Sequence, residues 1–168
     1  FDFANSLFGQ FRGGLAYVNI VASMIFSGMS GLALADAAGL GRIEYEARRS
    51  RGYDKDLSLG VTASSTVIGP IIPPSVILII YGVLAGVSIS SLFVAGVIPG
   101  LLLGFVLMGF TFLNIYSRGT DQREEFKLSR VISTFKKSFL PLLMPVIIIG
   151  GILGGIFTAT EAGAIAVV

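Results

Sequence analysis

A row of hydroxyl side chains followed by closely spaced prolines marks the segment best suited to bind a cation. Residues 62–75 read TASSTVIGPIIPPS, with four hydroxyl side chains in the first half and three prolines in the second. A proline has no amide donor, so Pro70, Pro73 and Pro74 leave carbonyl oxygens of the preceding turn without helical partners. Carbonyl oxygens beside hydroxyls are hard donors, which suit a hard cation such as Na⁺.

The affected carbonyls belong to Thr66, Gly69 and Pro70, four residues before each proline. Unwound backbone at membrane depth persists only where it is buried in protein or lines a water-filled cavity. The alternative is a proline kink whose carbonyls accept hydrogen bonds from neighbouring helices and from the adjacent Ser and Thr side chains. Because three prolines fall within five residues, the spacing favours the cation site.

Two acids, Asp36 and Glu161, stand in otherwise apolar surroundings. An unpaired carboxylate at mid-membrane would cost at least about 2.5–3.5 kcal/mol. Glu161 follows Thr158 at the spacing of a capping box, which predicts a helix start that continues through 158–168. Asp36 either satisfies backbone donors near a turn or takes part in ion or proton movement, and both interpretations stay open.

The elements that position these groups are expected to lie in a membrane. The 168 residues are 54% hydrophobic and 13% charged, against roughly 45–50% and about 25% in soluble domains. Nine charged residues lie in 42–56 and nine in 118–137, while 57–117 contains none. As a helix, this uncharged stretch would be about 90 Å long, roughly three hydrocarbon thicknesses.

The missing residue types exclude several functions. The chain has no Cys and no His, which excludes disulfides, iron–sulfur clusters and thiol nucleophiles and removes the commonest zinc ligand. Its net charge of +2 gives no case for nucleic-acid binding. A membrane aspartyl protease needs two facing acids, and Glu161 belongs to a capping motif. We therefore predict that the protein is not an enzyme.

Four apolar blocks predict an all-α integral membrane protein. Residues 57–81 predict a discontinuous transmembrane helix broken at the prolines, and 92–116 and 139–157 predict further transmembrane helices. Residues 13–41 contain six glycines and several polar side chains, which favours a re-entrant helical hairpin that turns near 27–31. A full span packed through small residues is the alternative.

The charged linkers predict the orientation. Segments 42–56 and 117–138 hold five and six Lys or Arg, whereas 82–91 holds none. The positive-inside bias places the first two at the cytoplasmic face and the third outside. Within 117–138, apolar residues at helical spacing predict an amphipathic connector on the membrane surface, with a solvated helical loop as the alternative. These residues are Leu128, Val131, Ile132 and Phe135.

Five motifs in order along nearly the whole chain resemble the large membrane subunit of tripartite ATP-independent periplasmic (TRAP) transporters, the DctM-like family. They are GGLAYVN at 13–19, SGMSGLALADAAGLG at 27–41, RGYDKDLSLGVTASSTVIGPIIPPS at 51–75, IYGVLAGVSI at 80–89 and GGILGGIFTATEAGAIAVV at 150–168. The family's subunit is more than twice as long. The chain is therefore expected to be an internal fragment centred on the first of two inverted repeats.

The resemblance implies a sodium-coupled secondary transporter with elevator-type alternating access in the bacterial inner membrane. It implies two protein partners besides membrane lipid, a small membrane subunit and a periplasmic binding protein. The implied substrate is a small organic acid such as a C4-dicarboxylate or sialic acid, and Na⁺ is the coupling ion with no other cofactor. A sodium and dicarboxylate symporter that needs no binding protein is the alternative.

The resemblance also implies a sodium site formed by the hairpin tip and the unwound segment. By motif position its ligands are Ser30, Leu32, Gly69, Ile72 and Pro74, mostly through carbonyl oxygens. The side chains expected to face the substrate are Ser27, Ser30, Ser64, Ser65 and Thr66.

Three positions depart from the family pattern. Leu32 replaces a small hydroxyl residue, so only its carbonyl could bind sodium. Lys55 and Ala159 replace prolines at positions of the N1 type, where proline is convenient but dispensable. The change at Leu32 is therefore the one expected to affect sodium affinity.

Overall fold

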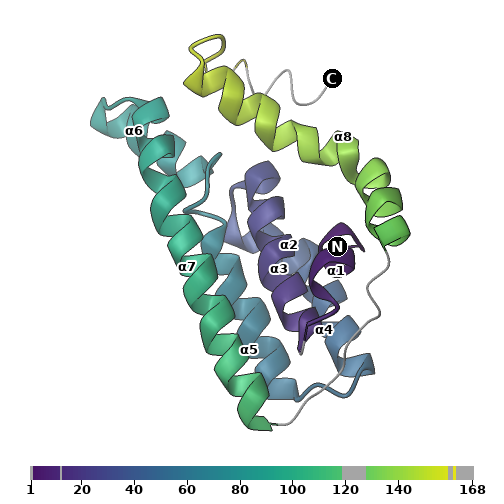
Figure 1. The fold of residues 1–168 in the computed structure, drawn as a ribbon. Helices are drawn as coiled ribbons and strands as arrows, with labels where there is room; N and C mark the ends of the chain where they lie inside the picture. The colour runs from purple at the N-terminus through teal and green to yellow at the C-terminus, as the bar shows by residue number, and fades with distance from the viewer. Residues whose placement is uncertain (1, 12, 119–127, 159–160, 162–168) are drawn as a thin grey trace.

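The computed structural model describes residues 2–11, 13–118, 128–158 and 161, and every regular element in them is helical (Figure 1). The elements are α1 (Asp2–Phe8), α2 (Gly14–Ser30), α3 (Ala33–Gly39), α4 (Gly41–Ser50), α5 (Lys55–Ser65), the 3₁₀ helix η1 (Thr66–Ile68), α6 (Val76–Ala85), α7 (Ile89–Arg118) and α8 (Leu128–Leu153). The prediction of an all-α chain is confirmed.

Two helices of the described residues are long and apolar enough to cross a membrane, Ile89–Ile115 in α7 and Val131–Leu153 in α8. Helix α7 continues through Pro99, because a single proline removes one helical hydrogen bond and leaves the flanking turns intact. Large side chains such as Phe105 and Phe110 are exposed on it. Helix α7 thus presents an apolar surface of the kind that contacts lipid or other transmembrane helices.

Helix α8 begins in the predicted connector 117–138 and continues through most of the predicted helix 139–157. Position 138 is therefore not an element boundary, and Pro141 and Pro145 lie inside the helix. Lys136 and Lys137 are exposed in its first half. The position of this half at the membrane surface stays a prediction, and residues 119–127 lie outside the described part of the chain.

The chain turns after α2, close to the place where the sequence predicts the hairpin turn, while the re-entrant hairpin itself stays a prediction. Helix α2 ends at Ser30, and the chain passes through Gly31 and the extended Leu32 into α3, which packs against α2. Gly31 has a φ of +61°, and its N–H donates to the Ser27 carbonyl at 2.9 Å. Glycine adopts this left-handed conformation without a steric penalty. That both ends of the hairpin lie at one membrane face stays a prediction.

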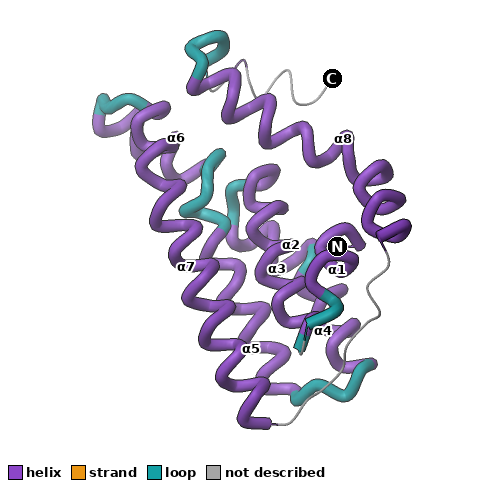
Figure 2. The backbone as a smooth tube through the Cα atoms, in the orientation of Figure 1, coloured by secondary structure: helices purple, strands orange, loops and turns teal. Residues whose placement is uncertain are grey.

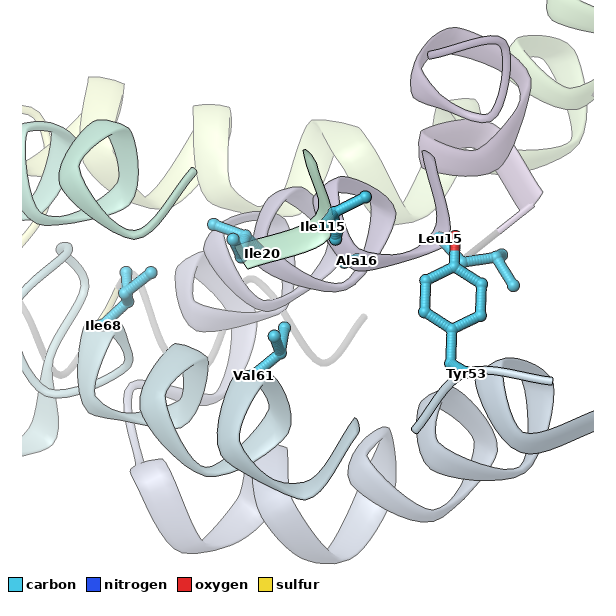
Figure 3. Packing of buried hydrophobic residues seen from close by; sticks show 7 residues of the cluster. All are labelled: Leu15, Ala16, Ile20, Tyr53, Val61, Ile68 and Ile115. Carbon is cyan, nitrogen blue, oxygen red and sulfur yellow. The ribbon is translucent and has the colours of Figure 1, made fainter. Parts of the chain in front are cut away.

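The predicted helix break is also present. Regular α-helix ends at Ser65, and no helix covers residues 69–75 before α6 begins at Val76 (Figure 2). An apolar cluster packs α2 against α5 and α7 beside this break (Figure 3). Its buried members are Leu15, Ala16, Ile20, Tyr53, Val61, Ile68 and Ile115. The cluster fixes where the end of α2 lies relative to the break.

The predicted capping pair at the end of the described chain is confirmed. The Thr158 N–H donates to Glu161 Oε2 at 2.8 Å, and the Glu161 N–H donates to the Thr158 hydroxyl at 3.3 Å. These reciprocal bonds are those of a capping box. The helix predicted to follow, together with Ala159, lies outside the described residues.

Candidate functional site

All three carbonyls that lose helical donors at the prolines have other partners. The Thr66 carbonyl accepts from the Gly69 N–H at 3.1 Å, which is a 3₁₀ bond. The Gly69 carbonyl accepts from the Ser27 hydroxyl at 3.0 Å, and the Pro70 carbonyl accepts from the Ser75 hydroxyl at 2.7 Å. The predicted loss of helical bonds is confirmed. The alternative, in which hydroxyls satisfy the carbonyls, holds for two of the three.

The backbone of the hairpin tip, residues 30–33, lies directly against the backbone of the break, residues 69–75. A Cβ atom added to Gly31 would lie 2.5 Å from the Pro74 carbonyl oxygen. A Cβ atom added to Gly69 would lie 3.2 Å from the Ala33 nitrogen and 3.3 Å from the Leu32 carbonyl carbon. Only residues without a side chain allow such close approach, so these two glycines bring tip and break together.

All five predicted sodium ligands lie around this contact with oxygen atoms of suitable type. The Ser27 hydroxyl lies 3.0 Å from the Gly69 carbonyl oxygen and 3.4 Å from that of Ile72. The Pro74 carbonyl faces Gly31, and Ser30 Oγ is shielded from solvent without a hydrogen-bond partner among the described residues. Carbonyl oxygens and a spare hydroxyl are the donors that Na⁺ prefers, so these residues fit a sodium ion.

Leu32 lies at the tip, where only its backbone carbonyl could bind a cation, because its side chain has no oxygen atom. The side chain is 40% exposed, and the Leu32 carbonyl accepts from the Asp36 N–H at 3.3 Å, in the first turn of α3. A carbonyl oxygen has two lone pairs, so this bond leaves one for another partner. Leu32 can therefore contribute a backbone oxygen only, as expected from the sequence.

The predicted substrate side chains do not share one surface. Ser27 and Ser65 are fully buried, and Thr66 is buried with its hydroxyl donating to the Ala63 carbonyl at 2.9 Å. Ser64 instead lines a cavity of about 220 Å³ beside α7. Ser30 is the only one of the set, within the described residues, whose shielded hydroxyl has no hydrogen-bond partner. The role of these five residues in substrate binding stays a prediction.

Sequence reasoning missed a buried polar network on α4. Residues 42–56 are predicted to be a cytoplasmic basic loop, yet α4 covers the first part of them, and Glu44 and Arg48 are 1% and 0% exposed. Arg48 donates to the Asn19 side-chain oxygen, to Thr62 Oγ1 and, at 3.0 Å, to the Ser58 carbonyl. The spacing of Glu44 and Arg48, one helical turn apart, was the signal that could have shown a helix here.

Asn19 is the central residue of this network. Its amide nitrogen donates to Glu44 Oε2 and, at 3.1 Å, to Ser65 Oγ. Helix α4 lies outside the predicted membrane segments. Burial raises the pKa of the Glu44 carboxyl, an effect that Arg48 opposes and Asp36 strengthens. The network ties α4 to both halves of the site, since Asn19 belongs to α2 and Ser65 ends α5.

Asp36 lies next to this network, at 1% exposure. Neither of its carboxylate oxygens has a hydrogen-bond partner among the described residues. Capping of backbone donors, one of the two interpretations of Asp36, is therefore not observed. The Ser23 hydroxyl lies beside Asp36, but its one proton is donated to Ser65 at 3.0 Å.

Comparison with known proteins shows which family the chain belongs to. Residues 1–168 match the family model described as "Tripartite ATP-independent periplasmic transporter, DctM component". The sialic acid TRAP transporter permease protein SiaT of Haemophilus influenzae is 49% identical over 166 residues, covering 99% of this chain and 27% of that protein. The sialic acid TRAP transporter large permease protein SiaM of Vibrio cholerae is 50% identical, covering 98% of this chain and 39% of that protein.

A third relative is named for a different substrate. The C4-dicarboxylate TRAP transporter large permease protein DctM of Pseudomonas aeruginosa is 36% identical over 167 residues, covering 99% of this chain and 39% of that protein. The chain thus spans between 27% and 39% of the length of these three relatives. All three are transporter permeases, in agreement with the prediction that the chain is not an enzyme. The chain belongs to the family of the DctM component of tripartite ATP-independent periplasmic transporters.

Proposed function

We propose that the chain is part of the large permease subunit of a sodium-coupled secondary transporter in the bacterial inner membrane. Its substrate is a small organic acid, of the sialic acid or C4-dicarboxylate class named for its relatives. A periplasmic binding protein delivers the substrate, and a small membrane subunit completes the permease. Segments 42–56 and 117–138 face the cytoplasm, in keeping with their Lys and Arg content.

The observation that carries sodium coupling is the convergence of oxygen atoms where the hairpin tip meets the break. Ser27 holds the Gly69 and Ile72 carbonyls on one side, while the Pro74 carbonyl faces Gly31 on the other. Each of these carbonyls belongs to backbone that prolines keep out of a helix. A sodium ion would be coordinated by these carbonyl oxygens. The ligands come from two segments, so sodium binding favours the docked tip over an undocked one.

The transport motion follows from which surfaces are tied together. The apolar cluster and the Asn19 network join α2, α4, α5 and α7 to the tip and the break. Helices α7 and α8 also expose long apolar faces. We infer that α2, α4, α5 and α7 move as one body against a scaffold formed by other transmembrane helices of the permease. Each sodium ion entering at about −100 mV contributes about 2.3 kcal/mol to uphill import.

The test uses the full-length transporter with its small subunit and binding protein, reconstituted in vesicles. Ser30→Ala removes the spare hydroxyl and is expected to raise the sodium concentration for half-maximal uptake several-fold. Ser50→Ala, an exposed serine on α4, is the matched control and is expected to behave as wild type. Unchanged uptake by Ser30→Ala at limiting sodium would contradict the site. Uptake without any binding protein would favour the binding-protein-independent symporter instead.

A further inference from the structure

Two carboxylates and one guanidinium are buried together where α4 packs on α2 and α3. Asp36, Glu44 and Arg48 are 1%, 1% and 0% exposed, so almost no water reaches them. Full ionisation of all three would leave one net negative charge in this site. Buried charges are tolerated when they are paired and hydrogen-bonded, and an excess charge costs several kcal/mol.

The hydrogen bonds around the two acids do not stabilise a second negative charge. Glu44 Oε2 accepts from the Asn19 amide, but Glu44 Oε1 has no partner within the described residues. The same holds for both carboxylate oxygens of Asp36. Charged carboxylates in proteins usually accept several hydrogen bonds, so three unpartnered oxygens indicate that a positive charge belongs here.

No other described cation on α4, or on the helices packed against it, is placed to supply that charge. The helices packed against α4 are α2, α3 and α5. Within their described residues, the charged and titratable groups are Tyr17 on α2, Asp36 on α3, and the exposed Lys55 and Asp56 at the start of α5. On α4 itself, Arg42 pairs with Glu46, and Arg49 donates to the Tyr53 carbonyl. Among the described residues of α2, α3, α4 and α5, Arg48 is thus the single buried cation in a cluster with two buried acids.

We propose that Glu44 is a proton-binding site, whose Oε1 atom carries one proton at neutral pH, so that one negative charge on Asp36 and one positive charge on Arg48 leave the buried cluster neutral overall. The burial that raises the pKa of Glu44 supports this assignment. A protonated Glu44 allows α4 to remain buried against α2. Loss of the proton places a second negative charge beside Asp36 and opposes that burial.

Infrared spectroscopy of the purified full-length transporter tests the proposal directly. The wild type is expected to show the stretching band of a buried protonated carboxyl at neutral pH, and this band should disappear as the pH is raised. Glu44→Gln should remove it. Glu46→Gln is the matched control on the same helix, since the Glu46 side chain is 61% exposed, and it should retain the band.

Gln resembles a protonated Glu in shape and charge, so the Glu44 variant is expected to fold, and gel filtration checks this. A wild type without a titrating carboxyl band would overturn the proposal, whatever the variants do. A band that persists in Glu44→Gln and vanishes in Asp36→Asn would assign the proton to Asp36 and overturn it as well. Binding of radioactive sodium tests whether a sodium ion, and not a proton, supplies the positive charge at this site. Loss of one bound sodium ion in Glu44→Gln, with no carboxyl band in the wild type, would show a sodium site instead.

Discussion

The Ser27 hydroxyl donates to the Gly69 carbonyl over 3.0 Å and joins α2 to the break 42 residues later in the chain. The same hydroxyl lies 3.4 Å from the Ile72 carbonyl. Ser27 is therefore the side chain that holds two of the carbonyls expected to bind sodium. This contact crosses from the hairpin to the break, so whatever changes it changes how the tip docks.

Ser27→Ala is expected to destabilise the docked tip. The substitution leaves the Gly69 carbonyl buried without its donor, which typically costs about 1–3 kcal/mol. Thermal unfolding of the full-length transporter in detergent measures the loss. Ser64→Ala removes an exposed hydroxyl one turn before the break and should leave the unfolding temperature unchanged. Equal unfolding temperatures for the two variants would show that the Ser27 bond contributes nothing to stability.

Gly31→Ala is expected to separate the tip from the break. The added Cβ would lie 2.5 Å from the Pro74 carbonyl oxygen, a distance that forces backbone to move. Sodium-dependent uptake should fall strongly, because the two ligand-bearing segments can no longer meet. Uptake as a function of sodium concentration measures this loss.

Gly86→Ala is the control for Gly31→Ala, since Gly86 also has a left-handed φ of +66°, but a Cβ atom added to it would meet no other atom within 4 Å. Both variants pay roughly 1–2 kcal/mol for the backbone conformation. Only the Gly31 variant meets the Pro74 carbonyl. Similar uptake by both would mean that the backbone conformation, and not the contact with the break, decides the effect.

The helix break at the prolines could be predicted from the sequence because its cause is local. Three prolines in five residues remove specific donors whatever surrounds them, and the helix does end before Gly69. The turn at Gly31 follows from a glycine in a small-residue stretch. The partners of the freed carbonyls depend on tertiary packing, however. That Ser27 on α2 would reach Gly69 is not encoded in the spacing within 62–75.

Leu32→Ser is expected to strengthen sodium binding. The Leu32 side chain cannot bind a cation, whereas a serine at this position would add a hydroxyl at the tip beside Ser30. The sodium concentration for half-maximal uptake should fall several-fold. Leu34→Ser, two residues further and 81% exposed, makes the same chemical change away from the break and should have no effect. An equal response from both variants would contradict a ligand position at residue 32.

The buried network on α4 shows why the rest of the site was not predictable. Charged residues in a linker ordinarily lie in solvent, and Arg42 and Glu46 do. Glu44 and Arg48 are in the same charged segment, but they lie on the face of α4 that packs against α2 and α5. Their burial depends on Asn19 and Ser58 being there to bond them. No local pattern specifies this arrangement.

Arg48→Ala is expected to destabilise the protein severely. It removes the buried cation that interacts with Glu44, together with three hydrogen bonds to Asn19, Ser58 and Thr62. Breaking one side of a buried ion pair typically costs about 3–5 kcal/mol. Arg42→Ala, on the exposed face of the same helix, breaks a solvated pair with Glu46 and should be close to neutral. Expression level and thermal unfolding compare them, and equal stability of the two variants would contradict the burial of Arg48.

The pH dependence of stability offers a separate check on Glu44. Its pKa in the folded protein is raised above the ordinary value of 4.5, so the folded chain binds the proton more tightly than the unfolded chain does. The contribution of this proton to stability is therefore complete below the ordinary pKa and is lost as the pH rises through the folded pKa. Each bound proton changes the free energy of unfolding by at most about 1.4 kcal/mol per pH unit.

The wild type should consequently lose stability relative to Glu44→Gln as the pH rises from acidic to mildly alkaline values. Glu46→Gln should run parallel to the wild type, because the Glu46 side chain is 61% exposed and lies outside the buried cluster. Thermal unfolding temperatures of the three proteins across this pH range give the comparison. If the unfolding temperatures of the wild type and Glu44→Gln change in parallel with pH, Glu44 is ionised in the folded protein. Arg48 then balances the negative charge of Glu44 and not that of Asp36.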